Sequence, residues 1–132
     1  MLERMLPVID IPFISASGRS DEACRALLRH CMARGAQFAV VMRGKAGAMA
    51  LSAARPSGFI EQPATACRVL DTLGAGDGFI AATLVGLLRQ EPPEQILWNA
   101  AVYAAEVCGW FGAFGHGQCI EEGDTEATRM TA

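Results

Sequence analysis

DTLGAGDGFIAATLVGLLR, residues 71–89, is a glycine-containing loop that leads directly into an apolar segment. Ile80, Leu84 and Leu87 recur there at helical spacing, with the small residues Ala81 and Gly86 beside them. The sequence therefore predicts a helix over 78–89 that begins near Asp77, with the glycine loop at its amino-terminal end.

This loop has the chemistry of an anion site. Gly74 and Gly76 leave backbone N–H groups unshielded at the positive end of a helix, where phosphate oxygens bind. Asp77 adds a carboxylate, and phosphoryl transfer to an alcohol needs a base for the hydroxyl proton. The alternative is structural, because Gly-x-Gly also forms tight turns and Asp often caps helices. No Lys-Ser or Lys-Thr pair follows Gly76, and the third glycine of a dinucleotide fingerprint is missing.

Strand and helix patterns alternate along the rest of the chain. Ser20 precedes an acidic first turn and an apolar stripe at helical spacing, which predict a helix that ends at Gly35. A last helix is predicted to begin at Pro92 and to end at Gly109. We expect strands at 8–16, 38–42, 48–51 and 67–70, with a hairpin turn at 43–47 and an ill-defined segment at 59–60. These patterns predict an α/β fold whose mixed, mostly parallel sheet is flanked by helices.

Composition narrows the function classes. The 132 residues carry 11 basic and 14 acidic side chains, a net charge of −3, so neither nucleic acid nor an anionic membrane is an expected partner. No apolar run reaches the length of a membrane span, and the first residues do not resemble a secretory signal, which predicts a cytoplasmic protein. The 5 cysteines lack zinc-ligand spacing and are expected to be reduced thiols. We expect one domain over 1–132 with a frayed tail at 118–132.

The string from Asp71 to Ala82 resembles the carboxy-terminal signature of the PfkB/ribokinase family of carbohydrate kinases. The order of motifs is similar too: a Gly-x-x-Gly turn, Gly44 to Gly47, lies upstream, and an alanine-rich helix, 99–108, lies downstream. The likeness runs from about Val8 to Gly117. Within the family, the ending GAFGHG at 112–117 is similar to fructosamine-type (fructoselysine) kinases.

The resemblance implies a role for each matching residue. Asp77 would be the base that activates a sugar hydroxyl, and the backbone of Gly74, Ala75 and Gly76 would form the anion hole. ATP would be bound by Gly44, Lys45, Gly47 and Gly76, with Asn99 flanking the adenine, and Mg²⁺ would accompany the ATP phosphates. Asp71 and the Leu73 carbonyl would hold a monovalent cation such as K⁺, with the 112–115 loop completing that site.

Two kinds of departure from the family stand out. Thr83 replaces an apolar residue of the signature, and Arg43 precedes the nucleotide-binding glycine in place of a small or hydroxyl residue. The chain also corresponds to the nucleotide-binding half alone, without the amino-terminal half and its β lid. We therefore expect no sugar phosphorylation by this chain alone, and the alternative is a non-catalytic nucleotide-binding remnant or regulatory fragment. An exposed sheet edge would favour a homodimer or a complementing amino-terminal half as partner.

Overall fold

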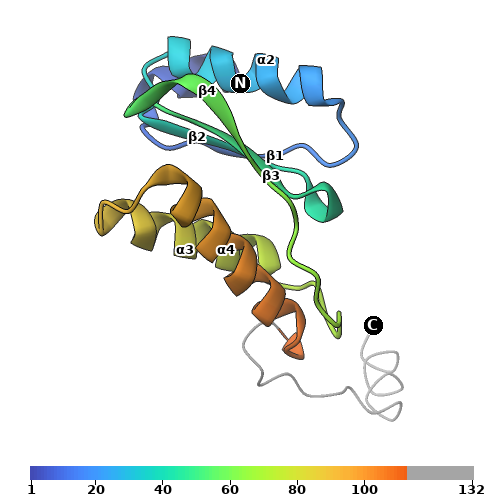
Figure 1. Ribbon diagram of the computed structural model, residues 1–132. Coiled ribbons are helices and arrows are strands. Elements are labelled where there is room, and N and C mark those ends of the chain that lie inside the picture. The colour runs from blue at the N-terminus through green and yellow to red at the C-terminus, as the bar shows by residue number, and fades with distance from the viewer. Residues whose placement is uncertain (113–132) are drawn as a thin grey trace, which may run out of the picture.

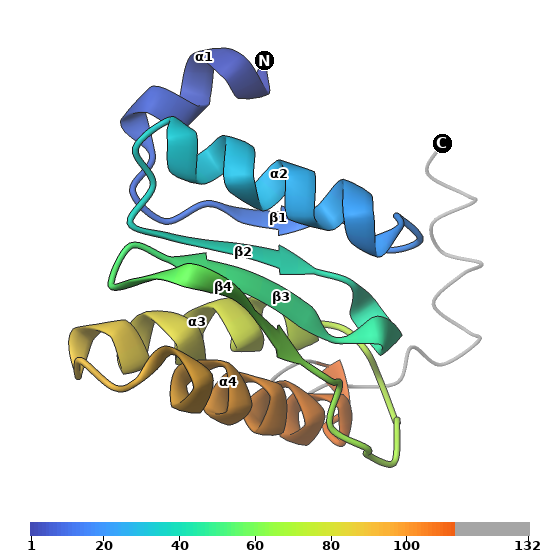
Figure 2. The same cartoon turned by 45° about the horizontal axis from the view of Figure 1, so that its top comes forward.

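The computed structural model describes residues 1–112, apart from the side chains of residues 56 and 57. A central sheet lies between two helical layers (Figures 1 and 2). The helices are α1 (Leu2–Met5), α2 (Asp21–Ala33), α3 (Ala75–Leu88) and α4 (Pro93–Cys108), with short 3-10 turns η1 (Leu6–Val8) and η2 (Gly44–Ala46). The strands are β1 (Phe13–Ser15), β2 (Phe38–Met42), β3 (Ala48–Ser52) and β4 (Arg55–Gln62).

The sheet has the strand order β1-β2-β3-β4. β1 pairs with β2 in parallel, with Phe13 opposite Val40, whereas β2–β3 and β3–β4 are antiparallel. The predicted hairpin is confirmed, since Met42 pairs with Ala48 across the η2 turn. The mixed, helix-flanked α/β architecture is confirmed as well, although only one of the three pairings in the described part of the chain is parallel. Short returns after β2 and β3 allow antiparallel pairing only.

Helix α2 covers one face of the sheet, as its pattern predicts. The Ser20 hydroxyl accepts a hydrogen bond from the Ala23 N–H at 3.2 Å and caps the helix. The buried side of α2 packs on one side of β2 and β3, because alternate strand residues point to opposite faces. This core contains Leu6, Cys24, Leu28, Cys31, Val41 and Met49.

The hairpin of α3 and α4 covers the opposite face. Its core joins Phe79, Leu97 and Ala100 to Phe38, Val40, Ala50 and Ile60 of the sheet. The two helices approach closely, and a Cβ placed on Gly86 would lie 2.8 Å from Ile96 Cγ1. The start of α3 consequently lies beside the end of α4 (Figure 1).

Three segments differ from the predicted elements. Residues 6–8 form the turn η1, so the first strand is shorter than 8–16 and begins at Phe13. The ill-defined 59–60 segment belongs to the eight-residue strand β4. The strand predicted at 67–70 is wrong, because the N–H of Leu70 donates to the Cys108 carbonyl and residues 67–70 have no sheet partner within residues 1–112. The tail predicted at 118–132 lies outside the described residues.

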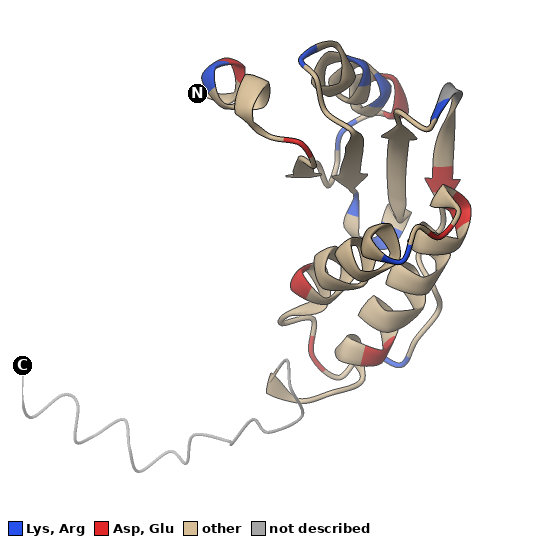
Figure 3. Ribbon diagram, turned by 90° about the vertical axis from the view of Figure 1, so that its left-hand side faces the viewer, with Lys and Arg blue, Asp and Glu red and all other residues tan. Residues whose placement is uncertain are grey.

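Charged residues are interspersed over the surface (Figure 3). Helix α2 carries both signs, including Arg29 beside Glu22 at 3.7 Å. No helix within residues 1–112 is long and apolar enough to cross a membrane.

Candidate functional site

The glycine loop ends in a left-handed residue that starts α3. Gly74 has φ +80° and occupies the N-cap position, a conformation that glycine adopts without steric cost. The Ala75 N–H donates to the Thr72 carbonyl at 3.2 Å, and the first helical bond joins the Gly78 N–H to the Gly74 carbonyl at 2.8 Å. Helix α3 thus begins at Ala75, three residues before the predicted start.

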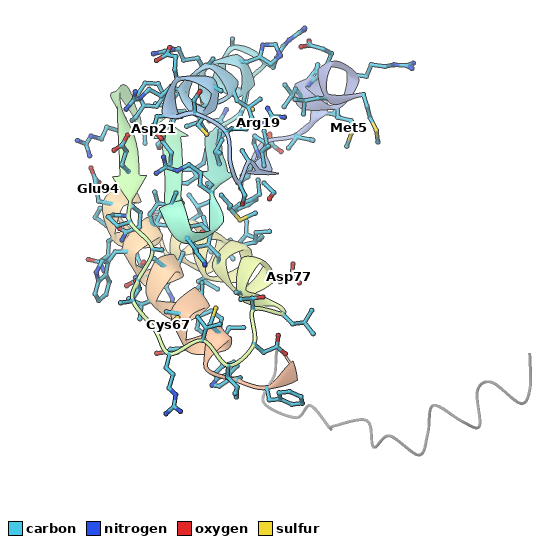
Figure 4. All side chains as sticks on the ribbon, turned by 90° about the vertical axis from the view of Figure 1, so that its right-hand side faces the viewer. Met5, Arg19, Asp21, Cys67, Asp77 and Glu94 are labelled. Carbon is cyan, nitrogen blue, oxygen red and sulfur yellow. The ribbon has the colours of Figure 1, made fainter. Side chains whose placement is uncertain are left out.

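Two backbone donors remain at this helix start. The N–H groups of Gly76 and Asp77 precede the first helical bond, and neither has a backbone acceptor among residues 1–112. A Cβ placed on Gly76 would meet nothing within 4 Å, and both Gly76 and Asp77 are exposed, so space is open beside these donors. Asp77 is exposed beside them on the first turn (Figure 4). The observed donors and open space fit a phosphate group.

The Asp71 carboxylate joins the glycine loop to the segment that follows α4 by hydrogen bonds. One carboxylate oxygen accepts the Leu73 N–H at 2.9 Å and the other accepts the Gly112 N–H at 3.1 Å. These two hydrogen bonds lower the pKa of the Asp71 carboxyl. The family resemblance predicts the 112–115 loop beside Asp71, and the bond to Gly112 brings the first residue of that loop there. No local sequence pattern indicates the bond itself, because the two residues are far apart in the chain. Each oxygen keeps a further lone pair, so a cation contact at Asp71 remains compatible with this geometry.

The backbone next to Asp71 is fixed to the end of α4. The N–H groups of Leu70 and Asp71 both donate to the Cys108 carbonyl, at 2.8 and 3.1 Å. Burial raises the pKa of the Cys108 thiol, and the neighbouring Cys67 and Asp71 raise it further. Residues 71–77, which we call the anion loop, are therefore held by α4 as well as by α3. The remaining part of the predicted cation loop, residues 113–115, lies outside the described residues.

The second glycine turn lies at the same end of the molecule as the start of α3 (Figures 1 and 2). Lys45 is exposed on η2, at the carboxyl end of β2. Gly47 has φ +86°, and a Cβ there would lie 2.1 Å from the Gln62 carbonyl oxygen. This close approach of the chain leaving β4 gives Gly47 a packing role. Gly44, with φ +60°, faces Ser17 Oγ, which would lie 3.2 Å from an added Cβ.

Arg43 links that turn to the start of α2. Its Nη1 donates to Asp21 Oδ1 at 2.7 Å and its Nη2 donates to the Ala46 carbonyl at 3.1 Å. The side chain is 10% exposed. The departure from the family pattern at this position is thus an ion pair that ties the turn to the start of α2.

Asn99 lies away from the anion loop. Its Nδ2 donates to Glu91 Oε2 at 3.1 Å, and its Oδ1 accepts from Gln95 Nε2 at 2.9 Å. It lines a cavity of about 380 Å³ between α3 and α4, together with Ala82, Val85, Gly86 and Tyr103. The start of α3 instead contacts Val107, about 12 Å further along α4 at the helical rise per residue. The structure brings the residues of 71–77 together and leaves Asn99 beside a separate cavity.

Within residues 1–112, no group of three His, Cys, Asp or Glu side chains could hold a metal ion. Mg²⁺ commonly uses one or two carboxylates together with substrate phosphates and water. The exposed Asp77 carboxylate beside the glycine loop therefore fits a magnesium ion that arrives with ATP.

Known proteins are similar to this chain in sequence and in fold. The model of the pfkB family of carbohydrate kinases matches residues 13–115. Fructosamine kinase FrlD of Bacillus subtilis (strain 168) is 34% identical over 132 residues, 98% of this chain and 45% of that protein. Fructoselysine 6-kinase of Shigella flexneri is 33% identical over 112 residues, 85% of this chain and 41% of that protein. The chain therefore spans less than half the length of these curated relatives.

Solved structures agree with the sequence matches. Arabidopsis thaliana ribokinase complexed with ribose and ATP gives a TM-score of 0.71 at 25% identity, over 82% of this chain and 37% of that chain. A putative ribokinase II from E. coli in complex with ATP and Mg²⁺ gives 0.71 at 23% identity, over 97% of this chain and 42% of that chain, and supports the fold alone. The resemblance seen in residues 71–82 is confirmed by the family match: this chain belongs to the pfkB family of carbohydrate kinases.

Proposed function

We propose that this chain is the phosphoryl-binding part of an ATP-dependent kinase that acts on a sugar hydroxyl. The observation that carries the proposal is the start of α3, where the N–H groups of Gly76 and Asp77 face open space beside the Asp77 carboxylate. An anion site and a base thus lie within one helical turn. Family membership supports the same reaction class.

The proposed reaction is a direct transfer. The sugar hydroxyl oxygen attacks the γ-phosphorus of ATP, its proton passes to the Asp77 carboxylate, and ADP leaves with the electrons of the broken P–O bond. The backbone of Gly74, Ala75 and Gly76 binds the transferred phosphoryl group. Mg²⁺ bound with ATP neutralises charge on the phosphates. A positioned base contributes about 10²–10⁴-fold to such a step.

The proposed nucleotide site extends from the η2 turn, at the same end of the molecule, to Asn99 further along α4. Gly44, Lys45 and Gly47 would border the ATP phosphates, and the exposed Lys45 ammonium would offer a charge for them. Asn99 would border the adenine, while Asp71 and the Leu73 carbonyl would hold K⁺. The structural neighbour from Arabidopsis thaliana, a ribokinase complexed with ribose and ATP, supports the nucleotide.

An amine-linked ketose is the proposed substrate class. Two curated relatives, at 34% and 33% identity, are a fructosamine kinase and a fructoselysine 6-kinase. Such a substrate supplies a primary sugar hydroxyl as acceptor.

The free edge of β1 is the proposed place for a partner. The Ala16 N–H donates to the Met42 carbonyl, and the Val40 N–H donates to the Pro12 carbonyl, so residues 12, 14 and 16 face β2. The backbone of Phe13 and Ser15 faces the other way, where no strand pairs with it within the described range. A strand from a second copy of the chain, or from a chain with the remainder of the kinase fold, would satisfy this edge.

Gly76→Ala tests the anion site, since the added methyl narrows the open space beside the donors without touching the protein. We expect MgATP binding, measured by calorimetry on the full chain, to weaken at least tenfold, about 1.4 kcal/mol. Gly58→Ala is the matched control, because a Cβ there also meets nothing within 4 Å. Equal affinity in the Gly76→Ala and Gly58→Ala chains would refute the phosphate site.

Asp77→Asn separates catalysis from binding. We expect it to retain MgATP binding and to abolish ADP formation in the presence of fructoselysine, measured with and without an added amino-terminal kinase portion. MgATP binding with no ADP formation by the unsubstituted chain under either condition would instead favour the nucleotide-binding remnant. Turnover that survives Asp77→Asn would exclude Asp77 as the base.

A further inference from the structure

Helix α3 leaves one apolar flank outside the core. We call Ile80, Leu84 and Leu88 the outer flank: Ile80 is half-buried, whereas Leu84 and Leu88 are 38% and 85% exposed. Ile80 and Leu84 belong to the apolar stripe that the sequence predicts for this helix, so part of that stripe stays uncovered. Apart from Asp77 and Thr83, α3 contains only apolar residues and glycine, and a helix of this kind is normally covered on all sides. The described part of the chain does not supply that cover.

The packing of α3 fixes the direction in which the outer flank points. Gly78 and Gly86 mark the side that faces α4, because Cβ atoms added there would meet α4 side chains at 3.0 and 2.8 Å. Each residue of the outer flank lies two positions from one of these glycines. Two positions turn an α-helix by about 200°. The outer flank therefore points away from α4.

The outer flank lies on the same side of the molecule as the free edge of β1. Helix α4 packs against β4, the strand at the opposite edge of the sheet, and α3 lies beside α4 toward β1 (Figure 4). Phe13 of β1 is half-buried and packs against the core that includes Phe79 of α3. The backbone of Phe13 and Ser15 is unpaired on the outer side of β1 within residues 1–112. The unpaired edge and the apolar flank thus belong to one surface.

We propose that this surface is the interface of a symmetric dimer, with a second copy of the chain as its occupant. A two-fold axis perpendicular to the sheet reverses the direction of both β1 and α3, so one axis pairs edge with edge and flank with flank. At the edge, Phe13 of one copy lies opposite Ser15 of the other, and each such pair exchanges two N–H···O bonds in an antiparallel ladder. The sheet then continues from one copy into the next.

The outer flank is its own complement under this axis. With Leu84 on the axis, Ile80 of one copy lies opposite Leu88 of the other. Residues 80–88 contain no charged side chain, so no like charges meet in this antiparallel contact. A stable interface buries about 800 Å² per partner, more than three side chains supply. The dimer therefore needs the edge and the flank together, and their placement on one side provides both.

The remainder of a kinase fold is the alternative occupant, because this chain spans less than half the length of its curated relatives. That occupant has to be added to a sample, whereas a second copy is present in every solution of the chain. The inference includes the β1 edge proposed above as a partner site and does not depend on kinase activity. Its outcome is read from association, and that of the proposed function from MgATP binding and ADP formation.

Leu84→Glu tests the flank, with self-association of the full chain measured by sedimentation velocity over a concentration series. The substitution places a charge at the centre of the interface, and we expect dimerisation to weaken about tenfold or more. Val85→Glu is the matched control, because Val85 is 45% exposed on the same helix but lines the cavity between α3 and α4. The control should dimerise as the unsubstituted chain does. Thermal melting followed by circular dichroism checks that both variants fold.

Ile80→Lys and Leu88→Glu test the antiparallel register. Each variant alone should dimerise more weakly than the unsubstituted chain, because a charge meets an apolar side chain. An equimolar mixture should associate about tenfold more tightly than either variant alone, since the introduced ammonium and carboxylate lie opposite each other. Leu88 is almost fully exposed in the single chain, so Leu88→Glu leaves the fold intact.

Three results would overturn the proposal. A chain that stays monomeric at every concentration would leave this surface to the remainder of the kinase fold. Equal dimerisation of the Leu84→Glu and Val85→Glu chains would place the interface elsewhere. A mixture of Ile80→Lys and Leu88→Glu chains that associates no more tightly than its components would exclude the two-fold arrangement.

Discussion

At the scale of single residues, Asp71 shows how one carboxylate organises the site. Both of its oxygens accept backbone N–H groups, one from its own loop at Leu73 and one from beyond α4 at Gly112. Sequence resemblance implied a cation ligand at this position. The structure adds a bridge between two loops, and this bridge positions Gly74 to Asp77 whether or not a cation binds.

We predict that Asp71→Asn lowers the melting temperature at pH 7. An asparagine has one acceptor oxygen, so one of the two N–H bonds loses its partner. The pKa of Asp71 is lowered on folding, so its stabilisation is present above the unfolded-state pKa of about 3.9 and is lost as the pH falls through the folded-state value. Thermal unfolding followed by circular dichroism should therefore show a gap between the two proteins at pH 7 that shrinks in acid.

Asp77→Asn is the control for that experiment. Asp77 is exposed and accepts no hydrogen bond from residues 1–112, so its substitution should leave the melting temperature unchanged at either pH. An Asp71→Asn chain that melts with the unsubstituted protein at pH 7 would show that the bridge contributes nothing.

At the scale of elements, the glycines of α3 have different roles. Gly76 faces open space at the start of the helix, whereas Gly86 faces Ile96 of α4. The sequence pattern alone identifies both as small residues in a helix. Only the packing of α3 against α4 shows which one allows close approach and which one leaves room for a ligand.

Gly86→Ala is predicted to destabilise the chain. Its Cβ would lie 2.8 Å from Cγ1 of Ile96, whose β-branched side chain is stiff, and overpacking costs about 1–3 kcal/mol. Alanine regains about 1 kcal/mol of helix propensity, so we expect a net loss of up to about 2 kcal/mol in urea unfolding. Gly76→Ala in the same helix should lose nothing. Equal stability of the two variants would contradict the close helix contact.

The elements with strong local signals were predicted from sequence. Helix α2 has a cap at Ser20 and a clear apolar stripe, and the β2–β3 hairpin has a glycine turn. β4 was missed because it is defined by pairing with β3, such as Ile60 opposite Ala50, and carries no clear alternation of its own. Residues 67–70 resemble a strand locally, but the Cys108 carbonyl takes their hydrogen bonds.

At the scale of the whole molecule, large apolar residues remain exposed and β1 is an outer strand of the sheet. Val8, the last residue of η1, is 82% exposed, and Leu88, at the end of α3, is 85% exposed. An edge strand with unpaired backbone groups is a template for further strand pairing.

We predict that the chain self-associates through β1 at high concentration and that Ser15→Pro weakens this association at least tenfold, about 1.4 kcal/mol. The Ser15 N–H faces away from β2, so proline removes an edge donor without removing a bond of the sheet. Sedimentation velocity over a concentration series measures the change. Ser57→Pro does not test this edge, because position 57 lies on β4. Ser17→Ala, just after β1, is the control and should associate as the unsubstituted chain does.

A chain that stays monomeric at all concentrations would rule out β1 as a self-pairing edge. A Ser15→Pro chain that associates as strongly as the unsubstituted protein would place the interface on another surface.

Local patterns in the sequence identified the family, the mixed α/β class and a glycine loop that leads into a helix. These follow from local patterns, since glycine spacing, capping residues and apolar periodicity act over a few neighbouring residues. Only the tertiary structure shows that the N–H groups of Leu70 and Asp71 bond to the Cys108 carbonyl, that Arg43 pairs with Asp21, and that Gly47 packs against the chain after β4. Each of these contacts joins residues distant in sequence, and only the packing of whole elements brings such residues together.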